Sequence, residues 1–151
     1  MTLRILQFGT TGQVARELLA QAKDYDVEIT AVSRAEADFA DPQAVVRAMG
    51  AAKADLVVIA AAYTAVDLAE TERDLARTVN AETPGAIATA LGPDGPALVH
   101  VSTDYVFDGQ KGAPYVETDP TNPLNVYGAT KLAGEQAIMA SRARAVILRT
   151  S

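Results

Sequence analysis

Three side chains in the second half of the sequence have the types and the spacing that proton transfer requires. Tyr127 and Lys131 are four residues apart in a stretch that we expect to be helical, and Thr103 follows the apolar run 97–101. Residues four apart share one face of a helix. A free phenol has a pKa of about 10, and a neighbouring ammonium favours the phenolate. We therefore predict that Tyr127 is a general acid, that Lys131 lowers its pKa, and that Thr103 orients a substrate oxygen.

The pair also has an ordinary explanation, because a tyrosine and a lysine at this spacing occur by chance on many solvated helix faces. A glycine loop near the N-terminus favours the chemical explanation. The apolar run 3–8 is followed by Gly9 and Gly12, and then by Gln13, Val14 and a helical pattern. Such glycines permit a tight turn and the close approach of a pyrophosphate, which helix N-terminal amides receive. The spacing is G-x-x-G-x-x-A, so a plain strand–helix turn stays open as the alternative.

Three further stretches follow predicted strands and could contact a dinucleotide. Ser33 and Arg34 end the strand 27–32, where many dinucleotide folds carry an acid that binds the ribose 2′-hydroxyl. Arg34 could instead meet a 2′-phosphate, which favours NADPH, or it could simply be solvated. Phe39 could pack on an adenine ring, although packing in the core is the more ordinary role. The small residues at 60–64 permit a flat ligand, or else a tightly packed junction.

Strand and helix patterns alternate along the chain without repeats. This alternation predicts an α/β protein with a Rossmann-like, doubly wound parallel sheet and helices on both faces. The loop 108–124 is expected to lie over the strand ends, and His100 is expected to be a satisfied core residue. The predicted strands are 3–8, 27–32, 56–59, 97–101 and 143–149, and the predicted helices are 16–19, 42–49 (capped by Asp41), 67–71, 73–91 (kinked or broken at Pro84) and 125–140 (capped by Asn125).

Composition narrows the classes of function. The 151 residues suffice for one domain, and the net charge of −6 argues against nucleic acid as a partner. No apolar run reaches the roughly 18 residues of a membrane span, so no membrane partner is expected. The sequence has no cysteine, which excludes disulfides and fits a reducing compartment. We therefore expect a cytoplasmic protein.

The chain resembles the dTDP-4-dehydrorhamnose reductases, which are extended short-chain dehydrogenase/reductases. The resemblance runs through the whole chain, and the stretches 102–107 and 123–135 are specific to this family. The motifs that carry it are the glycine loop, Ala-Ala-Ala-Tyr-Thr-Ala-Val-Asp at 60–67, Ser-Thr-Asp-Tyr-Val-Phe-Asp-Gly at 102–109, Pro-Leu-Asn-Val-Tyr-Gly-Ala-Thr-Lys-Leu-Ala-Gly-Glu at 123–135, and Leu-Arg-Thr-Ser at 148–151.

The resemblance implies reduction of dTDP-4-dehydro-L-rhamnose by hydride transfer from NADPH or NADH. Tyr127 would donate the proton to the C4 keto oxygen, and Lys131 would hold the nicotinamide ribose. Thr103 and Asp104 would contact the dTDP-sugar. The residues expected at the cofactor are Gly9, Gly12, Gln13, Val14, Ser33, Arg34, Asp38, Phe39, Ala61, Ala62, Tyr63, Thr64, Tyr127 and Lys131.

The resemblance also sets expectations about assembly. Some family members bind Mg²⁺ at a dimer contact through an acid that matches Glu17, so the resemblance also implies Mg²⁺ and a homodimer. Residues 1–151 would form the NAD(P)-binding Rossmann domain, and the substrate-binding domain of the family would lie beyond this chain. We therefore expect the chain alone to bind dinucleotide and to reduce substrate poorly or not at all.

Two other functions stay open. One is a nucleotide-sugar epimerase or dehydratase of the same superfamily, although no glutamate follows Asp104, as dehydratases usually require. The other is a non-catalytic regulatory subunit that binds NADP. The intact set of Thr103, Tyr127 and Lys131 favours catalysis. One departure from the family pattern is Ile59, which stands where an asparagine is frequent.

Overall fold

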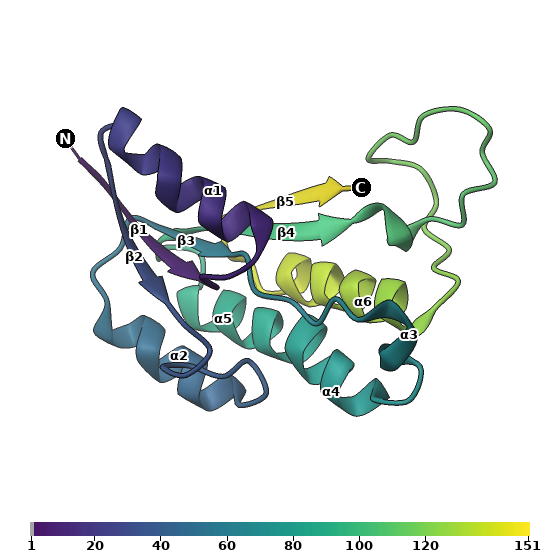
Figure 1. Ribbon diagram of the computed structural model, residues 1–151, viewed down its shortest axis with the longest axis horizontal. Coiled ribbons are helices and arrows are strands. Elements are labelled where there is room, and N and C mark those ends of the chain that lie inside the picture. Colours follow the sequence, from purple (N-terminus) through teal and green to yellow (C-terminus); the bar gives the residue numbers. More distant parts are fainter. Residues whose placement is uncertain (1) are drawn as a thin grey trace.

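A computed structural model describes residues 2–151 and has at its centre one parallel sheet of five strands (Figure 1). The strand order is β2-β1-β3-β4-β5. The chain leaves β1 for one edge of the sheet and then crosses to β3 on the other side, so the sheet is doubly wound and Rossmann-like, as predicted. The strands are β1 (Leu3–Phe8), β2 (Val27–Val32), β3 (Leu56–Ile59), β4 (Ala97–Thr103) and β5 (Ala145–Thr150).

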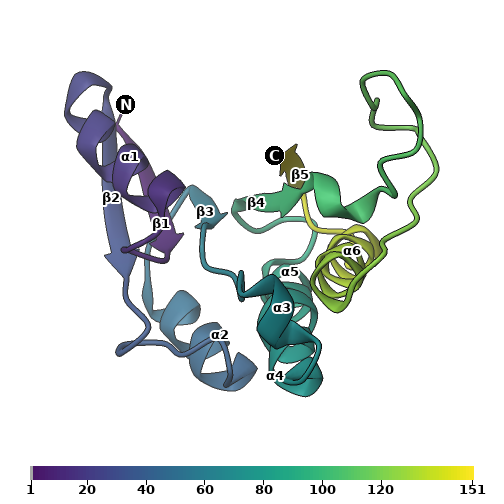
Figure 2. The ribbon, with the colours of Figure 1, turned by 45° about the vertical axis from the view of Figure 1, so that its right-hand side comes forward.

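Helices cover both faces of the sheet (Figure 2). On one face lies α1, and on the other lie α2, α5 and α6. The helices are α1 (Gln13–Gln21), α2 (Pro42–Ala51), α3 (Val66–Ala69), α4 (Arg73–Arg77), α5 (Thr83–Leu91) and α6 (Val126–Ala140), with short 3₁₀ turns η1 (Ala22–Asp24) and η3 (Asp104–Val106) and a π-helical turn η2 (Thr78–Glu82).

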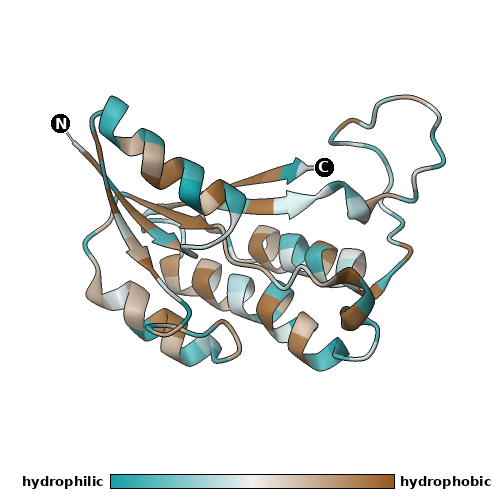
Figure 3. Cartoon of the chain, viewed as in Figure 1, coloured by the Kyte–Doolittle hydropathy of each residue, from teal (hydrophilic) through white to brown (hydrophobic). Residues whose placement is uncertain are grey.

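The central strands are buried because helices cover them, and their sequences are accordingly apolar runs. Leu6, Phe8 and Ile59 are almost completely buried, and each contributes roughly 1.5–3 kcal/mol of hydrophobic stabilisation. Figure 3 shows this as hydrophobic colouring along β1, β3 and β4. Ile59 is thus a core residue here. Phe39 packs edge-on against Phe8 with ring centroids 5.6 Å apart, which confirms its core role.

The strand ends are staggered. Phe8, Val32 and Ile59 are in register with one another, and Ile59 is paired with His100. β4 continues for three more residues, to Thr103. Since a strand rises about 3.3 Å per residue, Thr103 extends roughly 10 Å beyond the ends of β1 and β3.

Both predicted helix caps are present. The Asp41 side chain accepts the Ala44 amide at 3.0 Å, with Pro42 in the first turn of α2. The Asn125 Oδ1 atom accepts the Gly128 amide at 2.7 Å and starts α6 immediately before Tyr127.

The predicted kink at Pro84 takes the form of a widened turn. The helical run from α4 to α5 is not broken, but η2 adopts π-helical geometry. A proline inside a helix has no amide proton to donate, and its ring crowds the carbonyl four residues earlier, here that of Asn80. The π turn accommodates both effects, because its hydrogen bonds span five residues instead of four.

His100 is completely buried, as predicted, but only partly satisfied. Its Nε2 atom lies 3.4 Å from the Lys131 Nζ atom, while Nδ1 has no hydrogen-bond partner among residues 2–151. Burial, and secondly the charge of Lys131, lowers the pKa of His100 to about 3, so the ring is neutral.

The loop 108–124 contains neither helix nor strand and projects beyond the carboxyl ends of β4 and β5 (Figure 1). Asp108 organises it by accepting from the Gln110 amide, the Tyr115 hydroxyl and the Asn122 side chain. Phe107 stacks on Tyr115 with centroids 4.2 Å apart. Within the described chain, no helix is both long enough and apolar enough to cross a membrane.

Candidate active site

Two adjoining grooves lie at the carboxyl edge of the sheet. They lie where the strand order reverses, between β1, which is followed by β2 on one side, and β3 on the other side. Open α/β sheets bind ligands at such a switch point. The first groove has a volume of about 720 Å³ and the second about 450 Å³. They share Gly12, Ala60, Ala62 and Thr64. The first contains the predicted residues Gly9, Gly12, Ser33, Arg34, Asp38, Phe39, Ala61, Ala62, Tyr63 and Thr64, and the second contains Gly12, Gln13, Val14, Ala62, Thr64, Thr103, Asp104, Tyr127 and Lys131.

The glycine loop between β1 and α1 has the geometry that anion binding requires. Gly9 has φ of 105°, and a Cβ atom there would lie 3.1 Å from the Ala60 carbonyl carbon and the Ala61 nitrogen. Only glycine therefore fits. Gly12 is the N-cap of α1 and supplies no side-chain hydrogen bond, so the first amides of the helix receive no cap from it. Such amides are well placed to receive a phosphate.

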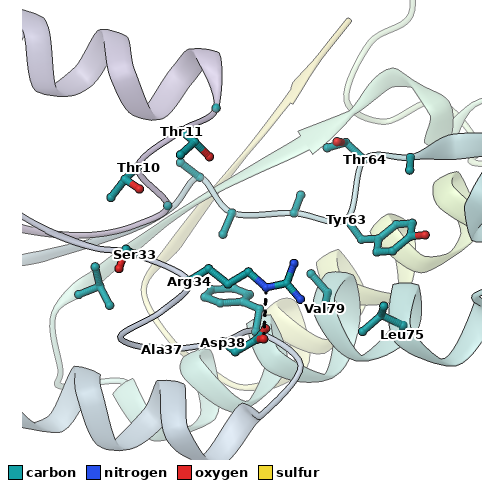
Figure 4. Close-up of a pocket in the computed structure, with 18 of the residues that line it drawn as sticks. Thr10, Thr11, Ser33, Arg34, Ala37, Asp38, Tyr63, Thr64, Leu75 and Val79 are labelled. Atoms are coloured by element: carbon teal, nitrogen blue, oxygen red, sulfur yellow. Dashed lines mark hydrogen bonds and ion pairs between the residues drawn. The ribbon is translucent and has the colours of Figure 1, made fainter.

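The loop after β2 forms the other wall of the first groove. In Figure 4 the Arg34 side chain extends from the end of β2 across the groove, and a dashed line joins it to Asp38. The Arg34 Nε atom lies 3.2 Å from Asp38 Oδ2, and the arginine side chain is 80% exposed. The pKa of Asp38 is lowered, first by the Ala40 amide and then by Arg34, so the aspartate is ionised. Arg34 thus lines the groove and is also solvated.

The loop after β3 is held by Asn80, which the π turn directs inward. Asn80 Oδ1 accepts the Tyr63 amide at 2.9 Å, and Nδ2 donates to the Tyr63 carbonyl at 3.0 Å. Nδ2 also lies 3.1 Å from the Thr130 hydroxyl on α6. The Tyr63 hydroxyl donates to Glu72 at 2.6 Å, which raises the pKa of this tyrosine to about 12. The shared wall of the two grooves is therefore fixed from two directions.

Thr103 and Tyr127 come together at the second groove, as the sequence predicts. A Cβ atom on Gly128 would lie 2.2 Å from the Tyr105 carbonyl oxygen, so α6 approaches the end of β4 closely at this glycine. The rings of Tyr105 and Tyr127 meet edge to face at 5.5 Å. The Thr103 hydroxyl accepts the Tyr105 amide at 3.2 Å and donates to Asp104 at 3.3 Å.

The predicted direction of the Tyr127 pKa is wrong for this structure. Half-burial raises the pKa of the phenol, with smaller contributions in the same direction from Asp104 and Tyr105, while the Thr103 hydroxyl acts in the opposite direction. The Lys131 ammonium is bound elsewhere. Its Nζ donates to the Val101 carbonyl at 2.7 Å, and burial lowers the pKa of this lysine to about 8.

The family model described as the RmlD substrate binding domain matches residues 3–151. The chain belongs to this family.

Several curated relatives of this RmlD family chain, from different bacteria, are named dTDP-4-dehydrorhamnose reductase. The chain is 48% identical over 136 residues to the dTDP-4-dehydrorhamnose reductase of Burkholderia thailandensis, and the match covers 90% of this chain and 45% of the relative. It is 44% identical over 155 residues to the reductase of that name from Escherichia coli, covering 99% and 51%. The chain thus spans about half the length of the curated relatives it matches.

Solved structures of the RmlD family have the same fold as this chain. The dTDP-4-dehydrorhamnose reductase of Bacillus anthracis in complex with NADP superposes with a TM-score of 0.93 at 34% identity, covering 100% of this chain and 54% of that one. The family resemblance and the fold predicted from the sequence are therefore both confirmed.

Sequence reasoning missed two residues that hold this RmlD family site together, Asn80 and Glu135. Glu135 is completely buried, accepts the Ser102 hydroxyl, and forms a two-pronged ion pair with Arg149 at 2.6 and 3.0 Å. It joins α6 to β4 one residue before Thr103. The signal was available, because Glu135 continues the four-residue spacing of Tyr127 and Lys131 along one helix face.

The structure gives no support to the Mg²⁺ site expected at Glu17. This glutamate is exposed on α1, and its carboxylate lies 3.4 Å from the Gln21 side chain. Across residues 2–151, no group of three or more histidine, cysteine, aspartate or glutamate side chains could hold a metal ion.

Proposed function

We propose that this chain is the NAD(P)-binding portion of a reductase that converts dTDP-4-dehydro-L-rhamnose to dTDP-L-rhamnose. The observation that carries the proposal is the second groove, which brings Thr103, Tyr127 and Lys131 to the same hollow as the glycine end of α1. Proton-donating and phosphate-binding elements thus adjoin, as a dinucleotide-dependent ketone reduction requires. The names of the relatives, and the NADP complex of the Bacillus anthracis reductase, support the choice of substrate and coenzyme.

The residues fit a dinucleotide. The absence of a side chain at Gly9 leaves room beside Ala60 and Ala61, which any Cβ atom would fill. The start of α1 offers backbone amides to a pyrophosphate. The adenosine half of the dinucleotide would lie along Ser33, Arg34 and Asp38. The nicotinamide half would lie along Ala62, Tyr63 and Thr64. When bound, the nicotinamide supplies the hydride.

The chain's own residues supply the proton and hold the substrate. Tyr127 carries its phenolic proton at neutral pH, because burial raises its pKa, so it is in the state that donates to a keto oxygen. Thr103 presents a hydroxyl beside it and orients that oxygen. Lys131 places a positive charge in the same groove. One of its ammonium protons is donated to the Val101 carbonyl, and the other protons remain for a ribose hydroxyl. A general acid at such a position contributes about 10²–10⁴-fold to the rate.

The test measures NADPH oxidation with dTDP-4-dehydro-L-rhamnose. It uses this chain and a chimera in which the chain replaces the matching half of the Escherichia coli relative, each with and without Tyr127→Phe. We expect NADPH binding in all four proteins and little turnover by the chain alone. The chimera should turn over, and Tyr127→Phe should reduce its rate at least about 100-fold.

The opposite result would be a chimera that binds NADPH with normal affinity and oxidises none. It would refute the reductase function and favour a regulatory NADP-binding module. A homodimer and a cytoplasmic location stay predictions from the sequence.

A further inference from the structure

A carboxylate of the chain itself occupies the donors at the end of β2. Glu36 Oε2 accepts the Ser33 amide at 2.8 Å and the Ser33 hydroxyl at 2.7 Å. Ser33 and Arg34 line the first groove, and Figure 4 shows both beside it. In dinucleotide folds this strand end lies at the adenosine ribose, where a 2′-hydroxyl or a 2′-phosphate binds.

Ser33 and Arg34 are each paired with an acid of the chain itself. Glu36 takes both donors of Ser33, and Asp38 takes the Nε proton of Arg34. The hydrogen bonds from Ser33 lower the pKa of Glu36, so the carboxylate is charged at neutral pH. An incoming phosphate needs the same donors and carries the same sign of charge.

The two acids differ in how firmly they are held. Asp38 also accepts the Ala40 amide at 2.9 Å, and this hydrogen bond shapes its own turn. Glu36 is exposed, and the two hydrogen bonds that its carboxylate accepts both come from Ser33. Rotation of its side chain therefore releases both Ser33 donors at once, without moving the backbone.

We propose that Glu36 determines the coenzyme preference of this site, because its carboxylate competes with the 2′-phosphate of NADPH for Ser33 and can accept the 2′-hydroxyl of NADH. The inference rests on the proposed function of the groove. Its physical basis is repulsion between one carboxylate and a phosphate that carries nearly two charges at close range. Glu36 thus reduces the preference in binding affinity for NADPH over NADH that Arg34 provides.

An alternative role for Glu36 is purely local. The carbonyl of Ser33 accepts the amides of Glu36 and Ala37, so the glutamate side chain closes a capped turn. Replacement by glutamine separates the two roles, because the amide oxygen can still accept from Ser33 while the charge is lost. A capping residue would change stability, whereas the proposed role changes the ratio of the two coenzyme affinities.

The experiment titrates the chain with NADPH and with NADH, following coenzyme fluorescence at 0.05 and 0.15 M salt. The variants are Glu36→Gln, Arg34→Ala and the control Glu28→Gln. Glu28 is exposed on β2 at the end far from the groove, paired in register with Arg4, and its replacement removes the same charge. The ratio of the NADH to the NADPH dissociation constant is the readout.

We expect Glu36→Gln to raise this ratio about tenfold by tightening NADPH, with NADH unchanged or weaker, and more strongly at low salt. Arg34→Ala should lower the ratio, and Glu28→Gln should leave it within twofold. An unchanged ratio in Glu36→Gln, or an equal rise in Glu28→Gln, would overturn the inference while leaving the coenzyme site intact. Failure of the unmodified chain to bind either coenzyme would refute the proposed function, and the inference with it.

Discussion

The Asn80 side chain binds both polar groups of the Tyr63 backbone. Its Oδ1 atom accepts the Tyr63 amide at 2.9 Å, and its Nδ2 atom donates to the Tyr63 carbonyl at 3.0 Å. The two residues belong to different elements, the π turn and the loop after β3. The hydrogen bonds thus fix the wall that both grooves share. Because Asn80 is buried, no water can replace its side chain there without rearrangement.

Replacement Asn80→Ala should therefore destabilise the chain by about 2–4 kcal/mol, since the backbone groups of Tyr63 lose their partner. Urea unfolding gives the free energy, and hydrogen exchange at the Tyr63 amide should accelerate. Asn122→Ala is the matched control, because the Asn122 side chain is exposed and donates to the exposed loop residue Asp108 at 3.1 Å, so its cost should be below about 0.5 kcal/mol. Equal losses in the two variants would contradict the role of Asn80.

A methyl group at Gly134 should disrupt the contact between α6 and the π turn. A Cβ atom there would lie 2.1 Å from the Asn80 carbonyl oxygen. Overpacking of this kind costs about 1–3 kcal/mol or more, and the thermal midpoint of Gly134→Ala should fall accordingly. Gly50→Ala serves as the control, because a Cβ at Gly50 on α2 meets no atom of residues 2–151 within 4 Å. That variant should be neutral or more stable by up to about 1 kcal/mol, since alanine favours helix. A Gly134→Ala protein as stable as the parent would show that the helices can separate freely.

The ion pair between Arg149 and Glu135 should be far more sensitive than those on the surface. Glu135 is completely buried, so Arg149→Ala leaves its charge without the guanidinium and should cost about 3–5 kcal/mol. Arg73→Ala breaks an exposed pair with Glu70 and should cost at most about 1 kcal/mol. Denaturant unfolding of both variants at one pH makes the comparison. Similar losses would mean that the buried pair contributes no more than a surface pair.

Lys131 should make stability rise with pH in the alkaline range. Burial lowers the pKa of Lys131 from 10.5 to about 8 in the folded chain. Below pH 8 the lysine is protonated in both states, and the folded state bears the cost of burying the cation. Between about pH 8 and 10.5 the folded state releases the proton first, so this cost disappears.

The corresponding measurement compares the unfolding free energy of the parent with that of Lys131→Met from pH 7 to 10.5. The difference should move in favour of the parent by up to about 3 kcal/mol. The difference cancels Tyr127, whose raised pKa has the opposite effect on stability in both proteins. A difference that stays flat across this range would exclude a lowered pKa at Lys131.

The fold could be predicted from the sequence because its signals are local. The apolar runs gave the bounds of β1, β2 and β3, and the caps at Asp41 and Asn125 gave the starts of α2 and α6. The meeting of Thr103 with Tyr127 followed from a strand end and a helix start that parallel topology must bring to one edge. The last strand begins at Ala145, two residues later than predicted.

The electrostatics of the site could not be predicted in the same way. Spacing places Lys131 one turn from Tyr127, but it does not reveal that the ammonium binds the Val101 carbonyl. Likewise, Pro84 indicated a disturbance of the helix without saying that a π turn would direct Asn80 inward. Glu36 was missed although its spacing from Ser33 is that of a capping box, because this spacing does not reveal that the capped serine lines the first groove.

The π turn also makes the site depend on the number of residues between α4 and α5. A regular α-helix advances 100° per residue, so deleting one residue from Thr78–Glu82 would return the run to α-helical winding. A π turn holds about one residue more than an α turn, so α4 and α5, with its core residues Ile87 and Leu91, would keep nearly their present relative rotation. The wide turn that directs Asn80 toward Tyr63 would be lost while the core contacts of α5 stay, so the length of this segment matters as much as the identity of Asn80.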